Sequence, residues 1–364
     1  MKHFFCTITI LLLCVFAASS QSTRKFALET VEDKMENSGT PYNPEIVVQE
    51  WHNGGSDYIS YCNNGKYIFS VSDSDVKLWD SKTGYLIRSF SDRIKYPKNA
   101  RIAPDSSYFV YENEANNIEI CDVKTRKTIT IFNLFSISSD EKATAKFAFS
   151  SDGNYLAMSY YDKIVIFEAH SLKRKYVLES TEFFYAGFEM DFSQDGTYLT
   201  TIAIPNSEDY QKQLGQFINV IWNVKKQSVE QVLSAQKDRF VTAVAISKNG
   251  KYNALASAEG NVFIFDLQNK TWLNMFAAGN SGYLVNSMDF SPDENNLLTV
   301  DALGYVGLWN IQNGKQIARR TPTSLEQSMM YFGNAVIDSN QFAFTNYHGI
   351  EIRNLVVLLK SMLV

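Results

Sequence analysis

Residues 149–168 read FSSDGNYLAMSYYDKIVIFE, and they contain the pattern from which the fold can be predicted. Its Asp152-Gly153 pair favours a tight hairpin between two twisted strands, because these residues accept positive φ at little cost. Apolar residues then alternate with period two up to Phe167-Glu168, as expected of strands and not of helices. The stretch therefore predicts consecutive antiparallel strands joined by short turns.

The alternating run that ends in an acidic or amide residue recurs along the chain. Its copies are VKLWD (76–80), IEICD (118–122), IVIFE (164–168), VIWN (220–223), VFIFD (262–266), VGLWN (306–310) and IEIRN (350–354). Their last residues lie 42 to 46 positions apart, except for one interval of 55 that contains a polar insertion, PNSEDYQKQLGQF, at residues 205–217. An S-x-D-G type turn precedes most copies and a Gly or Asn turn follows, so each repeat of about 45 residues holds four strands.

Seven such repeats predict an all-β seven-bladed β-propeller of four-stranded antiparallel sheets, because sheets of this size bury their faces only when packed radially. Trp79-Asp80 is a complete Trp-Asp dipeptide, and over roughly residues 45–360 the chain resembles the WD-repeat family of β-propellers. The structural repeat positions that this resemblance marks are Trp79, Asp80, Asp122, Phe167, Trp222, Phe265, Asp266 and Trp309. The family's hydrogen-bond network of His, Asp, Ser/Thr and Trp is incomplete in every repeat, so we expect aromatic packing between blades to stabilise the fold.

The first twenty residues, MKHFFCTITILLLCVFAASS, have the three parts of a secretory signal peptide: a basic start, an apolar run and small residues before Gln21. We expect cleavage after Ser20 and export to the periplasm or the medium. A membrane anchor and a lipoprotein acylated at Cys14 are the weaker alternatives. No later stretch approaches the length of apolar sequence that spans a membrane. Residues 21–44 are expected to form a flexible linker and residues 45–364 the propeller.

Two segments compete to complete the last blade. EIVVQEW (45–51) is spare before the first repeat and is the expected outer strand of blade seven, and VVLLKSML (356–363) is the rival. NPEIVVQEWH (43–52) also resembles the opening of exported bacterial proteins that fuse WD repeats to a caspase-like peptidase. Because the repeats occupy residues 45–364, that resemblance implies a propeller that stands alone or a shortened relative.

Composition and cysteine count exclude several classes of protein. The net charge of −5 provides no basic footprint for nucleic acid, so no nucleic-acid partner is expected. Only Cys62 and Cys121 follow the signal segment, which excludes a disulfide scaffold. One bridge between them or two separate buried thiols both fit, and we favour separate thiols because each lies in an apolar strand pattern.

Motifs for catalysis and metal binding are scarce. The sequence contains no G-x-S-x-G elbow, no phosphate-binding glycine loop and no C-x-x-C pair. His52, His170 and His348 lie in three different repeats, so no metal, cofactor or catalytic residue is assigned. Asp73 and Asp75 could offer oxygen ligands to Ca²⁺, but an Asp before the third strand more often accepts N–H groups of its own turn.

These observations predict an exported, monomeric, non-enzymatic propeller that binds a protein partner. Loops on a rigid scaffold often carry binding, so the insertion is the candidate contact, with Tyr210, Gln211, Lys212 and Leu214 as its residues. One alternative is a propeller hydrolase or lyase, marked by His, Asp, Glu or Arg side chains from several blades gathered at one end of the ring. Another is a regulatory partner of a caspase-like peptidase.

Overall fold

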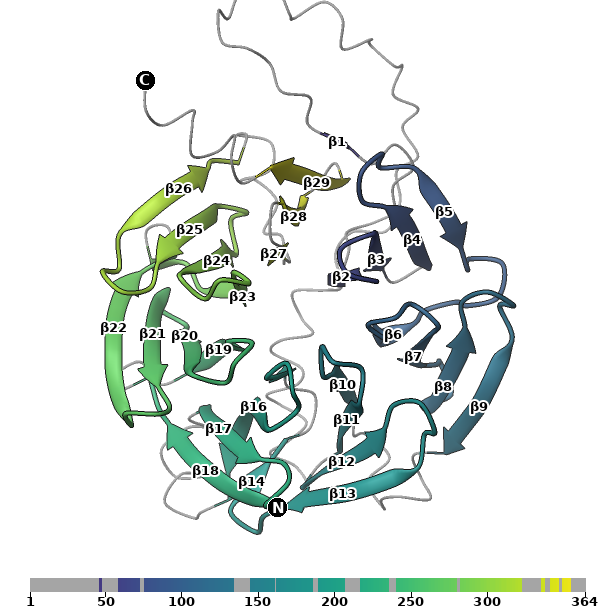
Figure 1. Cartoon of the computed structure of the whole chain (residues 1–364), viewed down its shortest axis with the longest axis horizontal. Coiled ribbons are helices and arrows are strands. Elements are labelled where there is room, and N and C mark those ends of the chain that lie inside the picture. Colours follow the sequence, from purple (N-terminus) through teal and green to yellow (C-terminus); the bar gives the residue numbers. More distant parts are fainter. Residues whose placement is uncertain are drawn as a thin grey trace, which may run out of the picture. The chain divides into compact units, whose positions relative to one another are not determined.

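The computed structural model describes residues 46–47, 58–72, 75–133, 145–160, 162–185, 189–206, 217–235, 240–279, 282–322, 335–337, 341–346 and 349–354. The chain divides into two units, Met1–Asn43 and Pro44–Val364, and every described residue belongs to the second. The described strands of that unit form seven antiparallel sheets arranged in a ring, so the predicted all-β propeller is confirmed (Figure 1).

The blades are numbered here in chain order. Blade 1 contains β2 (Tyr58–Cys62), β3 (Tyr67–Val71), β4 (Val76–Asp80) and β5 (Leu86–Ser89), and blade 2 contains β6 (Lys98–Ile102), β7 (Tyr108–Glu112), β8 (Asn117–Asp122) and β9 (Thr128–Asn133). Blade 3 contains β10 (Lys146–Phe149), β11 (Tyr155–Tyr160), β12 (Lys163–Glu168) and β13 (Arg174–Glu179). Blade 4 contains β14 (Phe183–Phe184), β15 (Met190–Phe192), β16 (Tyr198–Pro205), β17 (Ile218–Asn223) and β18 (Ser228–Leu233). Blade 5 contains β19 (Val241–Ile246), β20 (Tyr252–Ser257), β21 (Asn261–Asp266) and β22 (Thr271–Ala277), and blade 6 contains β23 (Val285–Phe290), β24 (Asn296–Asp301), β25 (Val306–Asn310) and β26 (Gln316–Arg320). Blade 7 contains β27 (Ala335–Ile337), β28 (Gln341–Asn346), β29 (Gly349–Asn354) and β1 (Ile46–Val47).

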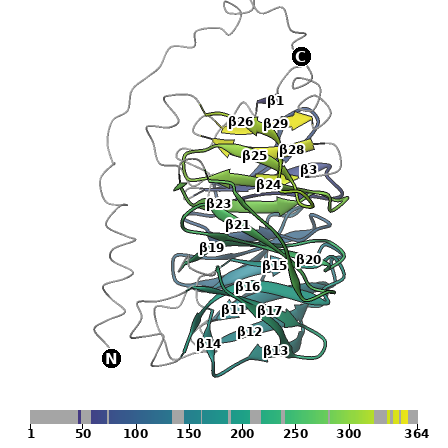
Figure 2. The same cartoon turned by 90° about the vertical axis from the view of Figure 1, so that its left-hand side faces the viewer.

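The first strand of each blade lies nearest the ring axis, and the inner strands run along that axis in the side view (Figure 2). Each innermost strand contacts the innermost strand of the next blade, and β27 of blade 7 contacts β2 of blade 1. The ring is therefore closed around its whole circumference.

Blade 7 is completed by the N-terminal strand. Ile46 pairs with Ile352 and Val47 with Glu351, so β1 lies antiparallel to β29 as its outer neighbour. This agrees with the prediction for the segment that begins at Glu45. The rival segment, residues 356–363, lies outside the described residues.

The hydrophobic core is divided among the interfaces between blades. One cluster joins blades 1 and 2 and contains both described cysteines, Cys62 and Cys121, beside Phe69 and Phe109, whose ring centroids are 5.6 Å apart. Both cysteines are free thiols, as predicted. Burial raises the pKa of Cys62 to about 12 and that of Cys121 to about 11, so neither forms a thiolate near neutral pH.

Blade 4 departs from the regular four-stranded pattern. The short strand β14 pairs with the far end of β16, at Ile204–Pro205, while β15 pairs with the beginning of β16. The sequence pattern did not predict β14, because Phe183–Phe184 is too short to show alternation. This extra strand lies at the base of the insertion that was singled out as a candidate contact.

Candidate binding rim

Each blade presents turns at both ends of its strands, and these define two rims of the ring. Turns from first to second strand and from third to fourth strand share one end of an antiparallel sheet, and we call this end the turn rim. Turns from second to third strand share the other end with the connections between blades, such as residues 90–97 between blades 1 and 2. We call that end the connection rim.

The turn rim is tied together by hydrogen bonds between neighbouring blades. Successive S-x-D-G type turns are linked through Asn63 N to Pro104 O (2.6 Å), Asp152 N to Gln194 O (3.0 Å), Gln194 N to Lys248 O (2.8 Å) and Asn249 N to Glu294 Oε1 (2.6 Å). Amide N–H groups of these turns are therefore used within the ring.

In four of these turns, the serine and the acid or amide two positions later have a structural role. Ser150 Oγ accepts the N–H of Tyr155 at 2.9 Å and donates to Asp152 Oδ1 at 2.6 Å. The same bonds recur around Ser193, Ser247 and Ser291.

Glycine in this motif is required by the neighbouring blade. Gly196 has φ of 65°, and a Cβ placed on it would overlap the ring of Tyr155 from the preceding blade. Gly250 meets Tyr198 in the same way, with the closest ring atom 2.7 Å from an ideal Cβ. The repeated turn thus specifies how consecutive blades pack.

The repeat positions carried over from the WD-repeat resemblance lie at the ends of the third strands. The aromatic members are buried, and the acidic members cap the turn to the fourth strand. Asp122 is one example: the N–H and hydroxyl of Thr125 donate to its carboxylate and lower its pKa. These positions, Trp79, Asp80, Asp122, Phe167, Trp222, Phe265, Asp266 and Trp309, therefore stabilise the blades.

Part of the tryptophan network survives. The indole N–H of Trp79 donates to Ser70 Oγ at 2.8 Å, and that of Trp309 donates to Thr299 Oγ1 at 2.9 Å. In blade 4 the corresponding residue, Thr201, donates to the backbone oxygens of Glu189 and Ile202 instead. The Trp222 indole nitrogen has no hydrogen-bond partner of normal geometry in the part of the chain described.

The inner strands carry an ionic cluster that the sequence motifs did not reveal. Glu189 accepts Arg101 Nη2 at 2.9 Å and Lys146 Nζ at 3.0 Å, which joins blades 2, 3 and 4. Burial alone would raise the pKa of Glu189, but the Lys146 ammonium and the Arg101 guanidinium outweigh it and hold that pKa at about 2. Charged residues inside the inner-strand segments KNARI and KFAF were the available signal.

Two further carboxyl groups of the inner strands have pKa values near neutrality. Asp191 Oδ2 accepts the N–H of Ile246 at 3.0 Å, and Asp289 Oδ2 accepts the N–H of Ile337 at 2.9 Å. Each bond ties one blade to the next. Burial raises the pKa of Asp191 to about 6 and that of Asp289 to about 7.

The predicted calcium and histidine candidates do not assemble into a site in the described part. Asp75 accepts from Ser72 and lies 3.7 Å from Lys77, and its candidate partner Asp73 lies outside that part. His170 is exposed at a turn, while His52 and His348 are not described. Among described residues, no group of three or more His, Cys, Asp or Glu side chains could hold a metal ion.

The connection rim is built differently from the turn rim. The predicted contact residues Tyr210, Gln211, Lys212 and Leu214 lie outside the described residues, but both stems of their loop are described. Asn206 donates from its backbone N–H to Glu182 O at 2.7 Å and from its amide to Thr181 O at 3.0 Å. The insertion therefore begins from a fixed base, formed by β14 and the end of β16 (Figure 1).

Exposed aromatic side chains lie on this rim. Phe217, at the end of the insertion, packs edge-on against Phe240 of the connection between blades 4 and 5, with ring centroids 5.3 Å apart. Phe240 remains 36% exposed. Tyr96 and Tyr283 are also exposed on connections between blades. Aromatic residues with accessible faces are enriched in protein interfaces. Phe217 belongs to the insertion that the sequence singled out, but sequence reasoning did not pick out Phe240, Tyr96 and Tyr283.

A groove of about 370 Å³ opens on the connection between blades 1 and 2. Arg93, Ile94 and Lys95 line it from the connection, and Tyr111 and Glu119 line it from blade 2. The Tyr111 hydroxyl donates to Glu119 Oε2 at 2.7 Å, which fixes the carboxylate inside the groove.

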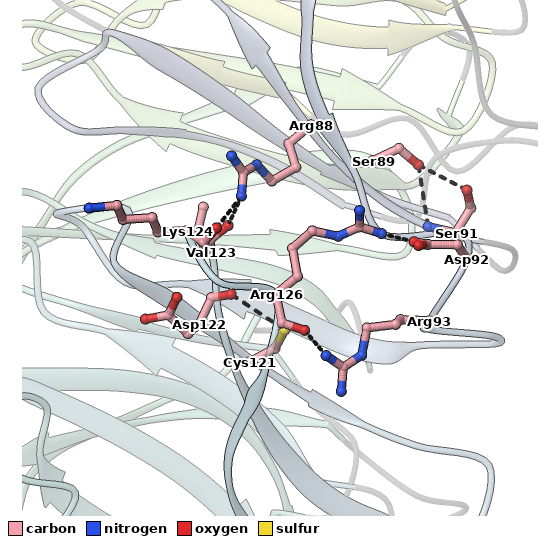
Figure 3. Close-up of polar contacts among 10 residues, drawn as sticks. All are labelled: Arg88, Ser89, Ser91, Asp92, Arg93, Cys121, Asp122, Val123, Lys124 and Arg126. Carbon is pink, nitrogen blue, oxygen red and sulfur yellow. Dashed lines mark hydrogen bonds and ion pairs between the residues drawn. The ribbon is translucent and has the colours of Figure 1, made fainter.

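Three arginines hold the outer parts of blades 1 and 2 together (Figure 3). Arg88 donates to the backbone oxygens of Val123 at 2.7 Å and Lys124 at 2.5 Å. Arg126 pairs with Asp92, and Arg93 donates to the backbone oxygen of Arg126. These bonds fix the turn between β8 and β9 against the preceding blade.

Comparison with known proteins agrees with this architecture. Residues 47–80 and 273–310 match the family model described as WD domain, G-beta repeat. These segments end at Asp80 of blade 1 and Asn310 of blade 6, where the aromatic-acid and aromatic-amide pairs were noted. No curated protein matches the chain. The two repeat matches and the ring of antiparallel sheets together support a WD-repeat β-propeller.

Proposed function

We propose that the protein is an exported, non-catalytic propeller that binds another protein through its connection rim. The observation that carries this proposal is the difference between the two rims. The turn rim uses its backbone donors within the ring, whereas the connection rim presents the insertion stem and the exposed Phe240, Tyr96 and Tyr283. WD-repeat propellers are typically protein-interaction scaffolds, which supports the same function.

A loop on a fixed base suits this role. Ordering a loop on binding costs less conformational entropy when its base is already held, and Asn206 and the Phe217–Phe240 pair hold the base of this insertion. The partner would then contact residues of the insertion together with the aromatic rings beside it.

Deletion of residues 207–216 tests this proposal, because it removes the loop and leaves Asn206 and Phe217 in place. Tagged full-length protein and the deletion variant are used to capture partners from the native periplasm or medium, and Phe240→Ser is tested in parallel. Tyr85→Ser, an exposed residue of the turn rim, is the matched control. A specific partner should be lost with the deletion and with Phe240→Ser but kept by the control. Unchanged partners after the deletion would contradict the assignment to this rim.

Export is supported by the signal pattern of residues 1–20. Among the described residues, no helix has the length and apolar character needed to cross a membrane. N-terminal sequencing of protein from the native host tests the proposal directly. A mature chain that begins at Gln21 in the periplasm or medium is expected, and an intact Met1 in the cytoplasm would contradict export.

One observation favours a second function, a propeller hydrolase or lyase. Asp191 and Asp289 have pKa values of about 6 and 7, which suit a general acid or base near neutral pH, and charged groups of several blades lie on the inner strands. Against this, both carboxylates already accept an N–H from the next blade. Turnover of a glycoside or ester panel that Asp289→Asn abolishes would establish the second function. The regulatory link to a caspase-like peptidase stays a prediction, which the presence of a peptidase in neighbouring reading frames would test.

A further inference from the structure

The outer strand of blade 2 differs from most other outer strands. Strand β9, Thr128–Asn133, reads TITIFN and contains no charged residue. Charges interrupt the outer strands β5, β13, β18 and β26 at Arg88, Arg174, Lys175, Glu179, Glu230, Arg319 and Arg320. Charged side chains on an edge strand oppose the addition of another strand. Strand β9 lacks this protection.

This strand ends its sheet in the described part of the chain, since the strand order of blade 2 is β6-β7-β8-β9. Its side chains Ile129 and Ile131 are 51% and 56% exposed. An edge strand presents backbone N–H and C=O groups outward, and two exposed isoleucines at alternate positions lie on the same face. Strand β9 thus offers both backbone hydrogen bonds and apolar contacts to an extended chain.

The groove between blades 1 and 2 is continuous with this edge. Ile131 pairs directly with Glu119, which lines the groove. Directly opposed residues of an antiparallel pair place their side chains on one face of the sheet. A strand added to β9 would therefore send alternate side chains over Ile131 toward the groove that holds Arg93 and Lys95.

Basic residues gather at the beginning of β9. Lys124 and Lys127 are exposed in the preceding turn, and the bonds of Arg88 and Arg126 hold that turn against blade 1 (Figure 3). Strand β22, which is also an outer strand without charged residues, differs here. Its preceding turn contains a single lysine, Lys270, which lies 3.6 Å from Glu230. Of these two edges, only β9 combines exposed isoleucines with two exposed lysines in a turn that is held against the preceding blade.

We propose that β9 is a docking edge for an extended segment of another protein, which adds antiparallel to it as a fifth strand. The segment has alternating apolar side chains and acidic residues toward its C-terminal end. In antiparallel addition the C-terminal end of the segment lies beside the beginning of β9, where Lys124 and Lys127 are exposed. The inference shares with the proposed function only the assumption that a protein is bound, and it places the contact on a different surface.

Two fluorescein-labelled peptides test the proposal with the whole propeller by fluorescence anisotropy. One reads Thr-Val-Thr-Val-Thr-Val-Glu-Glu, and the other has the same composition with its Glu-Glu pair at the N-terminus. The first peptide should bind at least about tenfold more tightly, because only its acidic end reaches the lysines. Ile131→Lys should weaken its binding by about tenfold or more, and Lys124→Glu with Lys127→Glu should remove the preference between the two peptides.

Met275→Lys is the matched control, since Met275 is 57% exposed on β22, which also lacks charged residues. It should leave peptide binding unchanged, and thermal unfolding of each variant shows that the fold is kept. The proposal is overturned if neither peptide binds the unaltered protein or if Ile131→Lys and Met275→Lys weaken binding equally. A concentration-dependent dimer that Ile131→Lys abolishes would also overturn it, because the occupant would then be a second copy of this chain. Deletion of residues 207–216 should not affect peptide binding, which separates this test from that of the connection rim.

Discussion

Replacement of Asp289 by asparagine should stabilise the protein at neutral pH and leave it unchanged at acid pH. Burial raises the pKa of this carboxyl from 3.8 to about 7. Below pH of about 4 the group is protonated in both the folded and the unfolded state. As the pH rises to about 7, the unfolded chain loses the proton before the folded chain does, and the folded state becomes progressively less stable.

The size of this stabilisation follows from the difference in the pKa of Asp289 between the unfolded and the folded chain. About three pKa units correspond to at most roughly 4 kcal/mol, since each unit is worth about 1.4 kcal/mol. Asp289 retains partial contact with solvent, which screens the charge, so we expect about 1–2 kcal/mol. Asparagine is uncharged at every pH and keeps a carbonyl oxygen that can accept the N–H of Ile337. The stabilisation should therefore grow between pH 4 and 7 and then level off.

Urea unfolding of both proteins at pH 4.5, 6 and 8 measures this difference. Asp293→Asn is the control of opposite sign. Hydrogen bonds from Ser291 and Asn295 outweigh burial and lower the pKa of Asp293, so its carboxylate stabilises the fold above pH of about 4 and loses this effect only at lower pH. Asp293→Asn should therefore destabilise the protein by a similar amount at pH 4.5, 6 and 8. If Asp289→Asn changes the free energy of unfolding equally at pH 4.5 and 8, or destabilises the protein at pH 8, the reasoning about its buried charge is wrong.

Three further predictions concern packing and buried polar groups. Gly196→Ala should destabilise the propeller by about 2–3 kcal/mol in urea unfolding, because alanine at this position would have both a positive φ and a methyl group that overlaps the ring of Tyr155. Gly153→Ala should cost only about 1 kcal/mol, because Gly153 has a positive φ but open space around it. Trp79→Phe should cost about 1 kcal/mol more than Trp222→Phe, because the first removes a 2.8 Å hydrogen bond to Ser70, whereas the Trp222 indole has no bond of normal geometry to a described residue; equal losses would contradict this. Both described cysteines should resist a thiol reagent at pH 8 until the protein is unfolded, and rapid labelling of the native protein would contradict their burial.

The repeat made most of the fold predictable. Each turn encodes its own geometry locally, since the serine, the acid and the glycine of residues 150–153 all lie within a few positions of the atoms they contact. Where glycine is replaced, the backbone keeps the same left-handed conformation: Ser106 has φ of 62° and Glu294 has φ of 60°. The period of the pattern then determined the number of blades.

The contacts that build the candidate surfaces were not predictable in this way. Arg101 and Glu189 are 88 positions apart, and Phe217 meets Phe240 only because blades 4 and 5 are neighbours in the ring. None of these residues belongs to the repeated motif, so no spacing distinguishes them from ordinary strand residues. The insertion was visible as an interruption of the period, but the strand β14 at its base was not.

Pairing of Ile46 with Ile352 affects the order in which the molecule can be assembled. Blades 1 to 6 depend on neighbouring segments and can form as the chain leaves the ribosome or a translocation pore. Blade 7 can form only after both β1 and β29 have emerged, because these two strands lie at opposite ends of the described chain. Until then the blade 1 side of the last interface, with Ile59, Ile68 and Trp79, remains uncovered. Slow non-local closure of this kind exposes apolar surface to aggregation, so the unclosed ring is the intermediate that a chaperone would need to protect.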